Sequence, residues 1–305
     1  MASIGVWDRS KMPKPLSEYT FRQHLRLQPL THAVKTARYR RIDQKFLSTP
    51  LEYGDVEEIR RRIGNQNILA TVAFDDPACL DMHLRLVKNF VTHDHHLIAD
   101  NSRDAGLAKE NQAIAHALGA SYLKMSLNPW TRRNPSRSHG AVLNWLWHNL
   151  ILPAKPTAFG FLDQDLFPTE ATDPFQPLID HDFYGDLRTA NHRWFLWAGF
   201  CFYKYSAIRD KNLDFGLDWF AGLDTGGGNW DILYRSADRS ALPSRPVKAF
   251  PAIAGVALDR ACFERRGVWI HEVGFGNDPS LKSHKRAALI ELLAGPLAQA
   301  AKATR

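Results

Sequence analysis

Two carboxylates one residue apart follow an apolar run near the middle of the chain. Residues 158–162 read Ala-Phe-Gly-Phe-Leu, and Asp163, Gln164 and Asp165 come directly after them. An apolar run of this length without alternation is typical of a strand buried on both faces. Open α/β sheets bind ligands at the carboxyl ends of their strands, and converging carboxylates suit a hard cation with phosphate ligands. The spacing therefore predicts a cation site where this strand leaves the sheet.

Polar residues also follow two earlier strand-like runs, at 68–74 and 95–99. They are Asp75 and Asp76 after the first run, and Asp100, Asn101 and Ser102 after the second. A local role is open for the aspartates, because one that precedes Pro77 can cap a helix and one at a strand end can close an Asx turn. Ligand binding and local structure are both compatible with these positions.

The elements that must position these residues alternate along the first half of the chain. Strands are expected at 68–74, 95–99, 121–125 and 158–162, with helices at 77–90, 110–118 and 139–152 between them. This order predicts an α/β fold with a mostly parallel central sheet flanked by helices. No G-x-G-x-x-G motif follows the first strand, so the pattern does not favour a dinucleotide-binding protein.

The second half of the chain is less regular. Strands are expected at 183–187, 194–202 and 247–253, although the apolar run 194–202 could equally form a buried helix. A glycine-rich loop at 223–231 is expected to enter a helix near Trp230. A last helix is expected at 282–293, before Gly295 and Pro296.

The net charge of +7 is concentrated at the N-terminus. Residues 1–50 hold ten Lys and Arg against three acidic residues, whereas residues 51–305 hold 29 of each sign. A nucleic-acid-binding domain places its basic surface on the folded body, so no nucleic acid is expected as a partner. A basic arm on a neutral body fits contact with an anionic surface or partner, or a solvated extension without one.

Cysteine usage and hydropathy favour the cytoplasm. The three cysteines are far apart and form no C-x-x-C pair, and no apolar run is long enough to span a bilayer. A cytoplasmic protein is therefore expected, and residues 1–50 are the segment suited to peripheral contact with the inner face of a membrane.

In order and spacing, several of these segments resemble the GT-A nucleotide-sugar glycosyltransferases of the family 2 type. The resemblance rests on the strand at 68–74, residues 98–102, the helix ending before Pro153 and residues 160–165, and it spans roughly residues 66–280. It implies a Rossmann-like GT-A fold and metal-dependent sugar transfer from a nucleoside-diphosphate sugar, with UDP- or GDP-sugars favoured. The acceptor is a glycan, a lipid or a protein that the sequence does not identify.

The resemblance also implies the metal ligands. Asp163, Asp165 and His271 would hold Mn²⁺ or Mg²⁺, which stabilises the leaving diphosphate as a Lewis acid. A mixed oxygen and imidazole shell suits Mn²⁺ better than Mg²⁺. For His271 the alternative is a hydrogen-bonded histidine at a strand end.

Donor and acceptor contacts follow from the same resemblance. The residues implied to bind the nucleotide sugar are Asp75, Asp76, Asp100, Asn101, Ser102, Ser138, His139 and Asp163. Ser138 and His139 lie near the start of a helix, where the dipole favours a diphosphate. The catalytic base would be Asp224 or Asp231, on either side of the glycines. The Glu-Asp pair usual in the family is missing here, and Asp224 is preferred because it precedes the glycines more closely.

These roles divide the chain into two parts. Residues 1–66 form the basic extension and residues 67–305 the glycosyltransferase domain. Within that domain, 67–168 would bind the nucleotide sugar, 169–280 the acceptor, and 281–305 form a C-terminal helix and tail. Two rivals remain: a nucleotidyltransferase, which usually has a basic glycine-rich loop where this chain has acidic residues, and a non-catalytic GT-A-like scaffold that binds an anionic partner through its basic arm.

Overall fold

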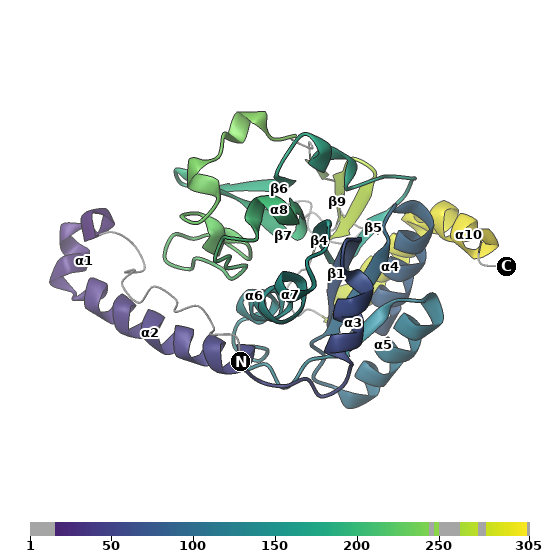
Figure 1. Cartoon of the computed structure of the whole chain (residues 1–305), viewed down its shortest axis with the longest axis horizontal. Coiled ribbons are helices and arrows are strands. Elements are labelled where there is room, and N and C mark those ends of the chain that lie inside the picture. Colours follow the sequence, from purple (N-terminus) through teal and green to yellow (C-terminus); the bar gives the residue numbers. More distant parts are fainter. Residues whose placement is uncertain (1–15, 244–246, 250–262, 274–278, 304–305) are drawn as a thin grey trace.

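A six-stranded sheet forms the centre of the molecule (Figure 1). The computed structural model describes residues 16–243, 247–249, 263–273 and 279–303. The strands of this sheet are β1 (Asn67–Ala73), β2 (His95–Asp100), β3 (Ser121–Lys124), β4 (Ala158–Asp163), β6 (Phe183–Ala190) and β7 (Arg193–Lys204). Their order is β3-β2-β1-β4-β7-β6, with β1 to β4 parallel and β7 antiparallel to both β4 and β6. The predicted α/β class with a mostly parallel, Rossmann-like sheet is confirmed, and the arrangement is consistent with a GT-A fold.

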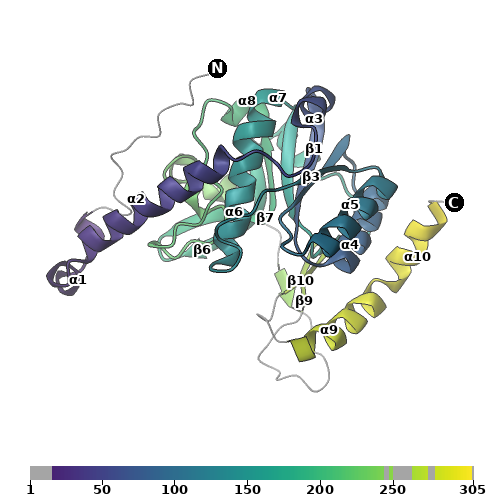
Figure 2. The same cartoon turned by 90° about the horizontal axis from the view of Figure 1, so that it is seen from below.

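Helices cover both faces of the sheet (Figure 2). They are α3 (Val56–Ile63) and α6 (Pro135–Leu146) on one face, and α4 (Pro77–Phe90) and α5 (Ala105–Leu118) on the other. Along β1, Ile68, Ala70 and Val72 join a core with α3 and α6, whereas Ala73 packs with α4 and α5. Because both faces of β1 are covered, its sequence is apolar without alternation, as expected for a parallel sheet.

The strand order reverses between β1 and β4. From β1 the chain continues outward to β2 and β3, and β4 then returns to the opposite side of β1. Such a switch point leaves a crevice outside the carboxyl ends of the two strands, where open α/β sheets bind ligands. Asp75 and Asp76 follow β1 and Asp163 ends β4, so these residues lie at the crevice.

A second, antiparallel sheet begins directly after Asp165. Its order is β5-β10-β9-β8, built from β5 (Leu166–Pro168), β10 (Trp269–Glu272), β9 (Phe263–Arg266) and β8 (Val247–Ala249). Two C-terminal helices follow, α9 (Pro279–Leu292) and α10 (Ala294–Ala303), and α10 contacts α4 (Figure 2). The polypeptide thus returns, about one hundred residues later, to the turn that carries the two aspartates.

Several expectations for the second half are settled by the structure. The run 194–202 belongs to strand β7, because it pairs with β4 and β6 on its two edges. The helix expected near Trp230 is wrong, since the chain there forms only short 3-10 turns at Gly227–Asn229 and Tyr234–Ser236. Of the strand expected at 247–253, residues 250–253 lie outside the described part of the chain.

The remaining elements are short. The helix expected at 139–152 is α6 extended by a π-helical turn (Trp147–Ile151) and by α7 (Leu152–Ala154). The others are α8 (Tyr205–Ile208) and 3-10 turns at Leu16–Glu18, Gln176–Ile179 and Arg239–Ala241.

The described part of the N-terminal segment is helical and attached to the body. α1 (Phe21–Leu25) lies at the outer end, and α2 (Gln28–Leu47) runs inward to contact α6 (Figure 1). Phe46 is buried in the main core, and the buried guanidinium of Arg193 pairs with Glu18 and Asp218 at 3.1 Å each. The segment therefore packs against the body, and a domain boundary at residue 66 stays a prediction. None of the helices in the described ranges is long and apolar enough to cross a bilayer.

Candidate metal centre and active site

The turn between β4 and β5 carries both aspartates. Asp163 ends β4, and Asp165 precedes β5. Between them, the side-chain oxygen of Gln164 accepts from the Phe74 amide at 2.9 Å, and its amide group donates to the Phe74 carbonyl at 3.0 Å. Gln164 therefore joins the turn to the end of β1 as a strand neighbour would, and it fixes the direction of both carboxylates. No role for Gln164 is predicted from the sequence, although an amide between two strand-end carboxylates is a usable signal.

His271 reaches the aspartates through the second sheet. β10 pairs with β5 so that His271 lies opposite Leu166, and the Glu272 amide donates to the Asp165 carbonyl at 2.9 Å. One ligand atom from each of Asp163, Asp165 and His271 lies within 4.8 Å of the other two. Nε2 of His271 is 3.5 Å from Oδ1 of Asp165. The three predicted ligands are therefore brought together from two sheets, and we call them the metal group.

Glu264 of β9 orients the His271 ring. It lies opposite His271 in the β9–β10 pair, and its Oε2 is 3.4 Å from Nδ1 of the ring. The hydrogen bond from His271, with Arg266 beside it, lowers the pKa of Glu264 to about 2, so this carboxylate is ionised and can only accept. Nδ1 therefore carries the proton and Nε2 faces Asp165, as in a histidine ligand oriented by an outer carboxylate.

A buried chain of charges supports Glu264 in turn. Arg266 pairs with Glu264 and with Asp186, and Arg188 pairs with Asp186 at 3.0 Å. The Trp197 ring lies 4.7 Å from the His271 ring, with the Arg188 and Arg266 guanidinium groups 4.4 and 5.1 Å from its centroid. These contacts immobilise the histidine. They join β6, β7, β9 and β10, so they are visible only once the strands are paired.

Burial and neighbouring charges shift the pKa of each member of the metal group. Burial lowers the pKa of His271, but Asp165 and Glu264 outweigh it and raise the pKa to about 9. Burial raises the pKa of Asp163, with His139 acting in the opposite direction. For Asp165 burial is outweighed by the positive His271, which brings its pKa below the usual value. The group therefore concentrates negative charge around one proton, which a divalent cation can replace.

The donor set fits a divalent cation. Oδ1 of Asp165 is buried, and the group that faces it is Nε2 of His271. Both this oxygen and Nε2 of His271 are ligand atoms that a divalent cation accepts, and they lie 3.5 Å apart. Gly199 on β7 lies tightly against the Trp197 ring and Asp163, because a Cβ there would be 2.2 Å from the ring and 2.5 Å from Oδ2 of Asp163.

His139 faces the metal group from the first turns of α6. Its Nε2 lies 3.4 Å from Oδ1 of Asp163. Asn134 caps this helix by accepting from the Arg137 amide at 2.9 Å. Ser138 is buried, and its hydroxyl accepts from Nδ2 of Asn101 at 2.9 Å. Of the two predicted helix-start residues, His139 is therefore beside the metal group and Ser138 supports the loop after β2.

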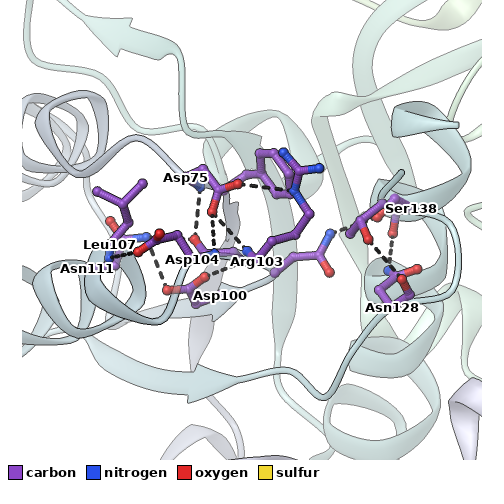
Figure 3. Close-up of polar contacts among 12 residues, drawn as sticks. Asp75, Asp100, Arg103, Asp104, Leu107, Asn111, Asn128 and Ser138 are labelled. Atoms are coloured by element: carbon purple, nitrogen blue, oxygen red, sulfur yellow. Dashed lines mark hydrogen bonds and ion pairs between the residues drawn. The ribbon is translucent and has the colours of Figure 1, made fainter. Parts of the chain in front are cut away.

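Asp75 and Asp100 hold the loop after β2 (Figure 3). Asp75 accepts from the Arg103 amide at 2.9 Å. Asp100 accepts from the Ser102 amide at 2.6 Å, which is the Asx turn left open as the alternative. It also accepts from the Tyr122 hydroxyl at 2.7 Å and is completely buried. Asp100 therefore holds the loop after β2, and its contact with a nucleobase stays a prediction.

The other predicted donor residues also make internal contacts. Asp76 caps α4 by accepting from the Cys79 amide at 3.2 Å, and it pairs with Arg286 at 3.0 Å, so the capping alternative is confirmed. Asn101 and Ser102 are buried, and the Ser102 hydroxyl accepts from the Asp75 amide. These contacts shape the crevice. Donor binding by Asp75, Asp76, Asn101 and Ser102 stays a prediction.

The glycine-rich loop lies between β7 and the start of α6. The Ala198 amide donates to the Thr225 carbonyl at 3.2 Å, and the Thr225 hydroxyl donates to the Ser136 carbonyl at 3.2 Å. Ala198 is the neighbour of Gly199, which borders Asp163. Two contacts therefore bring this loop to the edge of the crevice that holds the metal group.

The two predicted bases differ in their surroundings. Asp224 is half-buried and accepts from the Thr225 amide at 2.8 Å. Asp231 is 48% exposed and pairs with Arg235 at 3.4 Å, one turn along the chain. Gly226 has φ +97°, and a Cβ there would collide with the backbone of β7, so the loop can approach the sheet only with glycine at this place. The approach favours Asp224 over Asp231 as the residue near the crevice.

Comparisons with known proteins leave the function to be argued from the site. No family model matches the chain, and no curated protein matches it. Among solved structures, the chain is similar to the galactosyltransferase LgtC in complex with donor and acceptor sugar analogues, at 14% identity and a TM-score of 0.34, over 47% of this chain and 59% of that one. It is also similar to M. capricolum TrmK in complex with S-adenosyl-homocysteine, at 12% identity and a TM-score of 0.20, over 48% and 65%.

Both likenesses are weak and partial. The chain spans less than two thirds of the length of either neighbour, and similarity at these TM-scores identifies no shared activity. The two neighbours also differ from each other in kind, one a sugar transferase and the other solved with a methyl-donor product.

Proposed function

We propose that the chain is a metal-dependent glycosyltransferase that moves a sugar from a nucleoside-diphosphate sugar to an acceptor. The observation that carries the proposal is the convergence of Asp163, Asp165 and His271 at the carboxyl end of β4, where one ligand atom of each residue lies within 4.8 Å of the other two. This place is the switch point of the sheet, where a ligand is expected. Mn²⁺ or Mg²⁺ held there supplies a Lewis acid for the leaving diphosphate.

The residues of the chain divide the remaining work. His139 and the first turn of α6 orient the diphosphate, because helix N-termini and imidazole N–H groups both favour an anion. Asp163 and Asp165 would hold the cation, which offsets the negative charge of the donor's diphosphate at the end of β4. Asp224 takes the proton of the acceptor hydroxyl as the new bond forms, and Asp231 is the weaker candidate because it is exposed and paired.

Donor and metal binding can be tested together by thermal unfolding. The protein is heated with UDP, GDP, CDP or their sugars, each with and without Mn²⁺. A ligand at 100 times its Kd stabilises by about 2.7 kcal/mol, which corresponds to a rise in Tm of roughly 5 °C for a chain of this size. The rise should require both nucleotide and metal and disappear in Asp165→Asn. Asp210→Asn, at a side chain 89% exposed, is the matched control. No rise with any nucleotide would contradict the proposal.

The rival activities release different products. A glycosyltransferase releases a nucleoside diphosphate from its donor, whereas a nucleotidyltransferase releases pyrophosphate from a nucleoside triphosphate and a sugar phosphate. Both products are measured in parallel with Asp224→Asn. Diphosphate release that falls in this variant supports the transferase. Metal-dependent nucleotide binding without release of either product would favour a non-catalytic scaffold.

We also propose that α1 and the start of α2 make peripheral contact with an anionic membrane. Phe21, Leu25 and Leu30 are 78%, 70% and 61% exposed in a segment rich in arginine, and basic residues near an anionic surface attract it. Deleting residues 1–50 would also remove Phe46 from the core, so the better variant is Phe21→Ser with Leu25→Ser. It should lose cosedimentation with vesicles containing phosphatidylglycerol and keep nucleotide binding. Unchanged sedimentation would end the membrane proposal.

A further inference from the structure

A cavity of about 250 Å³ lies where α2, the residues that precede α6 and the loop after α8 meet. Its cationic lining comes from Lys35, Arg38, Arg133 and Arg137, and the described part of the chain contributes no carboxylate to the lining. A cavity of this size is slightly smaller than the usual range for drug-sized ligands, about 300–1,000 Å³. The cavity can therefore enclose a group smaller than a nucleotide sugar, and a larger ligand would extend out of it.

The charge of the cavity is largely uncompensated. Arg137 pairs with Asp43 at 3.1 Å, just outside the cavity lining. Lys35, Arg38 and Arg133 form no ion pair with a carboxylate of the described residues. Three cations that converge on one small cavity raise the local concentration of anions. The planar guanidinium groups match the oxygens of a phosphate, which they can hold with paired hydrogen bonds.

Aromatic rings complete the cavity. Nζ of Lys35 lies 3.5 Å from the centroid of Trp219, and the guanidinium of Arg137 lies 4.5 and 5.0 Å from the centroids of Tyr39 and Trp130. Trp219 is 52% exposed, so part of its surface is available to a ligand. Trp130 is fixed by its indole N–H, which donates to Asp43 at 2.6 Å. An exposed indole beside cations suits a ligand with one apolar ring face and one anionic group.

The cavity adjoins the acceptor side of the candidate active site. Arg137 is the neighbour of Ser136, whose carbonyl accepts from the Thr225 hydroxyl. Trp219 belongs to the same loop as Asp224, and its partner Lys35 belongs to α2. Arg137 and His139 lie two residues apart at the start of α6, so the cavity and the metal group are on different sides of this helix, with the loop that carries Thr225 beside its first turn. Here α2 of the N-terminal segment contacts the loop that carries Trp219 and Asp224.

We propose that this cavity binds the phosphate of a phosphorylated sugar, and that this sugar phosphate is the acceptor. The binding site stands on the cavity itself, whereas the acceptor role rests on the proposed glycosyltransferase function. A free sugar phosphate presents a phosphate monoester and a lipid-linked sugar phosphate a phosphodiester, and both offer anionic oxygens to the guanidinium groups. The latter would also use the exposed apolar residues of α1 and α2.

Binding is tested by calorimetry on the full chain in EDTA, without nucleotide. The probes are hexose 6-phosphate, the neutral hexose, inorganic phosphate and a short-chain lipid-linked sugar phosphate. Hexose 6-phosphate should bind at least tenfold more tightly than the neutral hexose. Arg38→Ala and Arg133→Ala should each weaken it at least fivefold. Trp219→Ala should weaken the binding of the sugar phosphate and leave the binding of inorganic phosphate unchanged. Arg209→Ala, at an exposed arginine outside the cavity, is the matched control.

The outcomes separate this proposal from the proposed function. Asp165→Asn should lose nucleotide binding and keep sugar-phosphate binding. Arg133→Ala should weaken sugar-phosphate binding and keep nucleotide binding. Equal binding of phosphorylated and neutral hexose, or variants that bind as the wild type does, would overturn the cavity as a phosphate site. Sugar-phosphate binding without transfer to it in the presence of donor and metal would overturn the acceptor role. Tenfold tighter binding of the lipid-linked probe than of the free ester would assign the lipid as its source.

Discussion

The protonation of His271 predicts how the stability of the metal-free protein changes with pH. Its pKa is raised from 6.5 to about 9 in the folded protein. A difference of 2.5 units corresponds to about 3 kcal/mol, since each unit is about 1.4 kcal/mol. The folded state binds the proton more tightly than the unfolded state. The contribution is therefore complete below pH 6.5, declines as the pH rises, and is lost above pH 9.

The assay is urea unfolding in EDTA at several values between pH 6 and pH 9.5, for the wild type and for His271→Gln. The variant also loses the packing of the ring against Trp197, a loss that does not depend on pH. The stability difference between the two proteins should therefore shrink by about 3 kcal/mol from the lowest to the highest pH. Groups away from His271 titrate in both proteins and cancel. Asp165 and Glu264 do not, because the variant lacks the histidine that lowers the pKa of both. His192→Gln, at an exposed histidine in the β6–β7 turn, is the control and should show no such trend.

Adding the metal reverses the direction of the pH dependence: the stabilisation by the metal increases as the pH rises. A cation needs the neutral imidazole, so it competes with the proton and binds about tenfold more weakly for each pH unit below 9. Mn²⁺ should therefore raise Tm more at pH 8.5 than at pH 6.5. A stability difference between wild type and His271→Gln that does not vary with pH would refute the reasoning. So would a Tm rise with Mn²⁺ that is the same at both pH values.

Three other positions carry predictions for single substitutions. Gly199→Ala places a Cβ 2.2 Å from the Trp197 ring and 2.5 Å from Oδ2 of Asp163, and should weaken metal-dependent nucleotide binding at least tenfold in calorimetry. Gly295→Ala, with open space around it, should not. Arg193→Ala leaves two carboxylates without their buried partner and should reduce the free energy of unfolding in urea by about 3 kcal/mol. Asp76→Ala removes the cap of α4 and should lower the free energy of unfolding by about 1 kcal/mol. An effect below 0.5 kcal/mol in either unfolding experiment (roughly the scatter for surface sites) would contradict the assigned contact.

The part of the fold that could be predicted is the part encoded by local pattern. β1 and β4 are apolar without alternation because helices or neighbouring strands cover both of their faces. Their ends are visible in the sequence as polar residues, so Asp163 and Asp165 could be placed at a strand end. The capping roles of Asp55 and Asp76 were open to prediction for the same reason, because each bond spans only three residues.

What could not be predicted depends on contacts between distant segments. Glu264 supports His271 only because β9 and β10 pair in one register, and a slip by one residue would turn it to the other face. Asp100 resembled a ligand residue at a strand end, but Tyr122 from the neighbouring strand buries it. The N-terminal charges resembled a solvated arm, yet Asp43 pairs with Arg137, which lies 94 residues further along the chain. The local sequence around each of these residues does not predict its distant partner.

The metal group draws its ligands from two sheets, and this gives a bound ion a mechanical role. Asp163 ends a strand of the large sheet, whereas His271 belongs to the small one. An ion that binds both residues would crosslink the small sheet to the large one. Amide exchange in β9 and β10 would then slow on metal addition, while exchange in β2 and β3 would not. The ion would add one crosslink to the contacts that already dock the C-terminal part of the chain, among them the Arg286–Asp76 pair and the packing of α10 on α4.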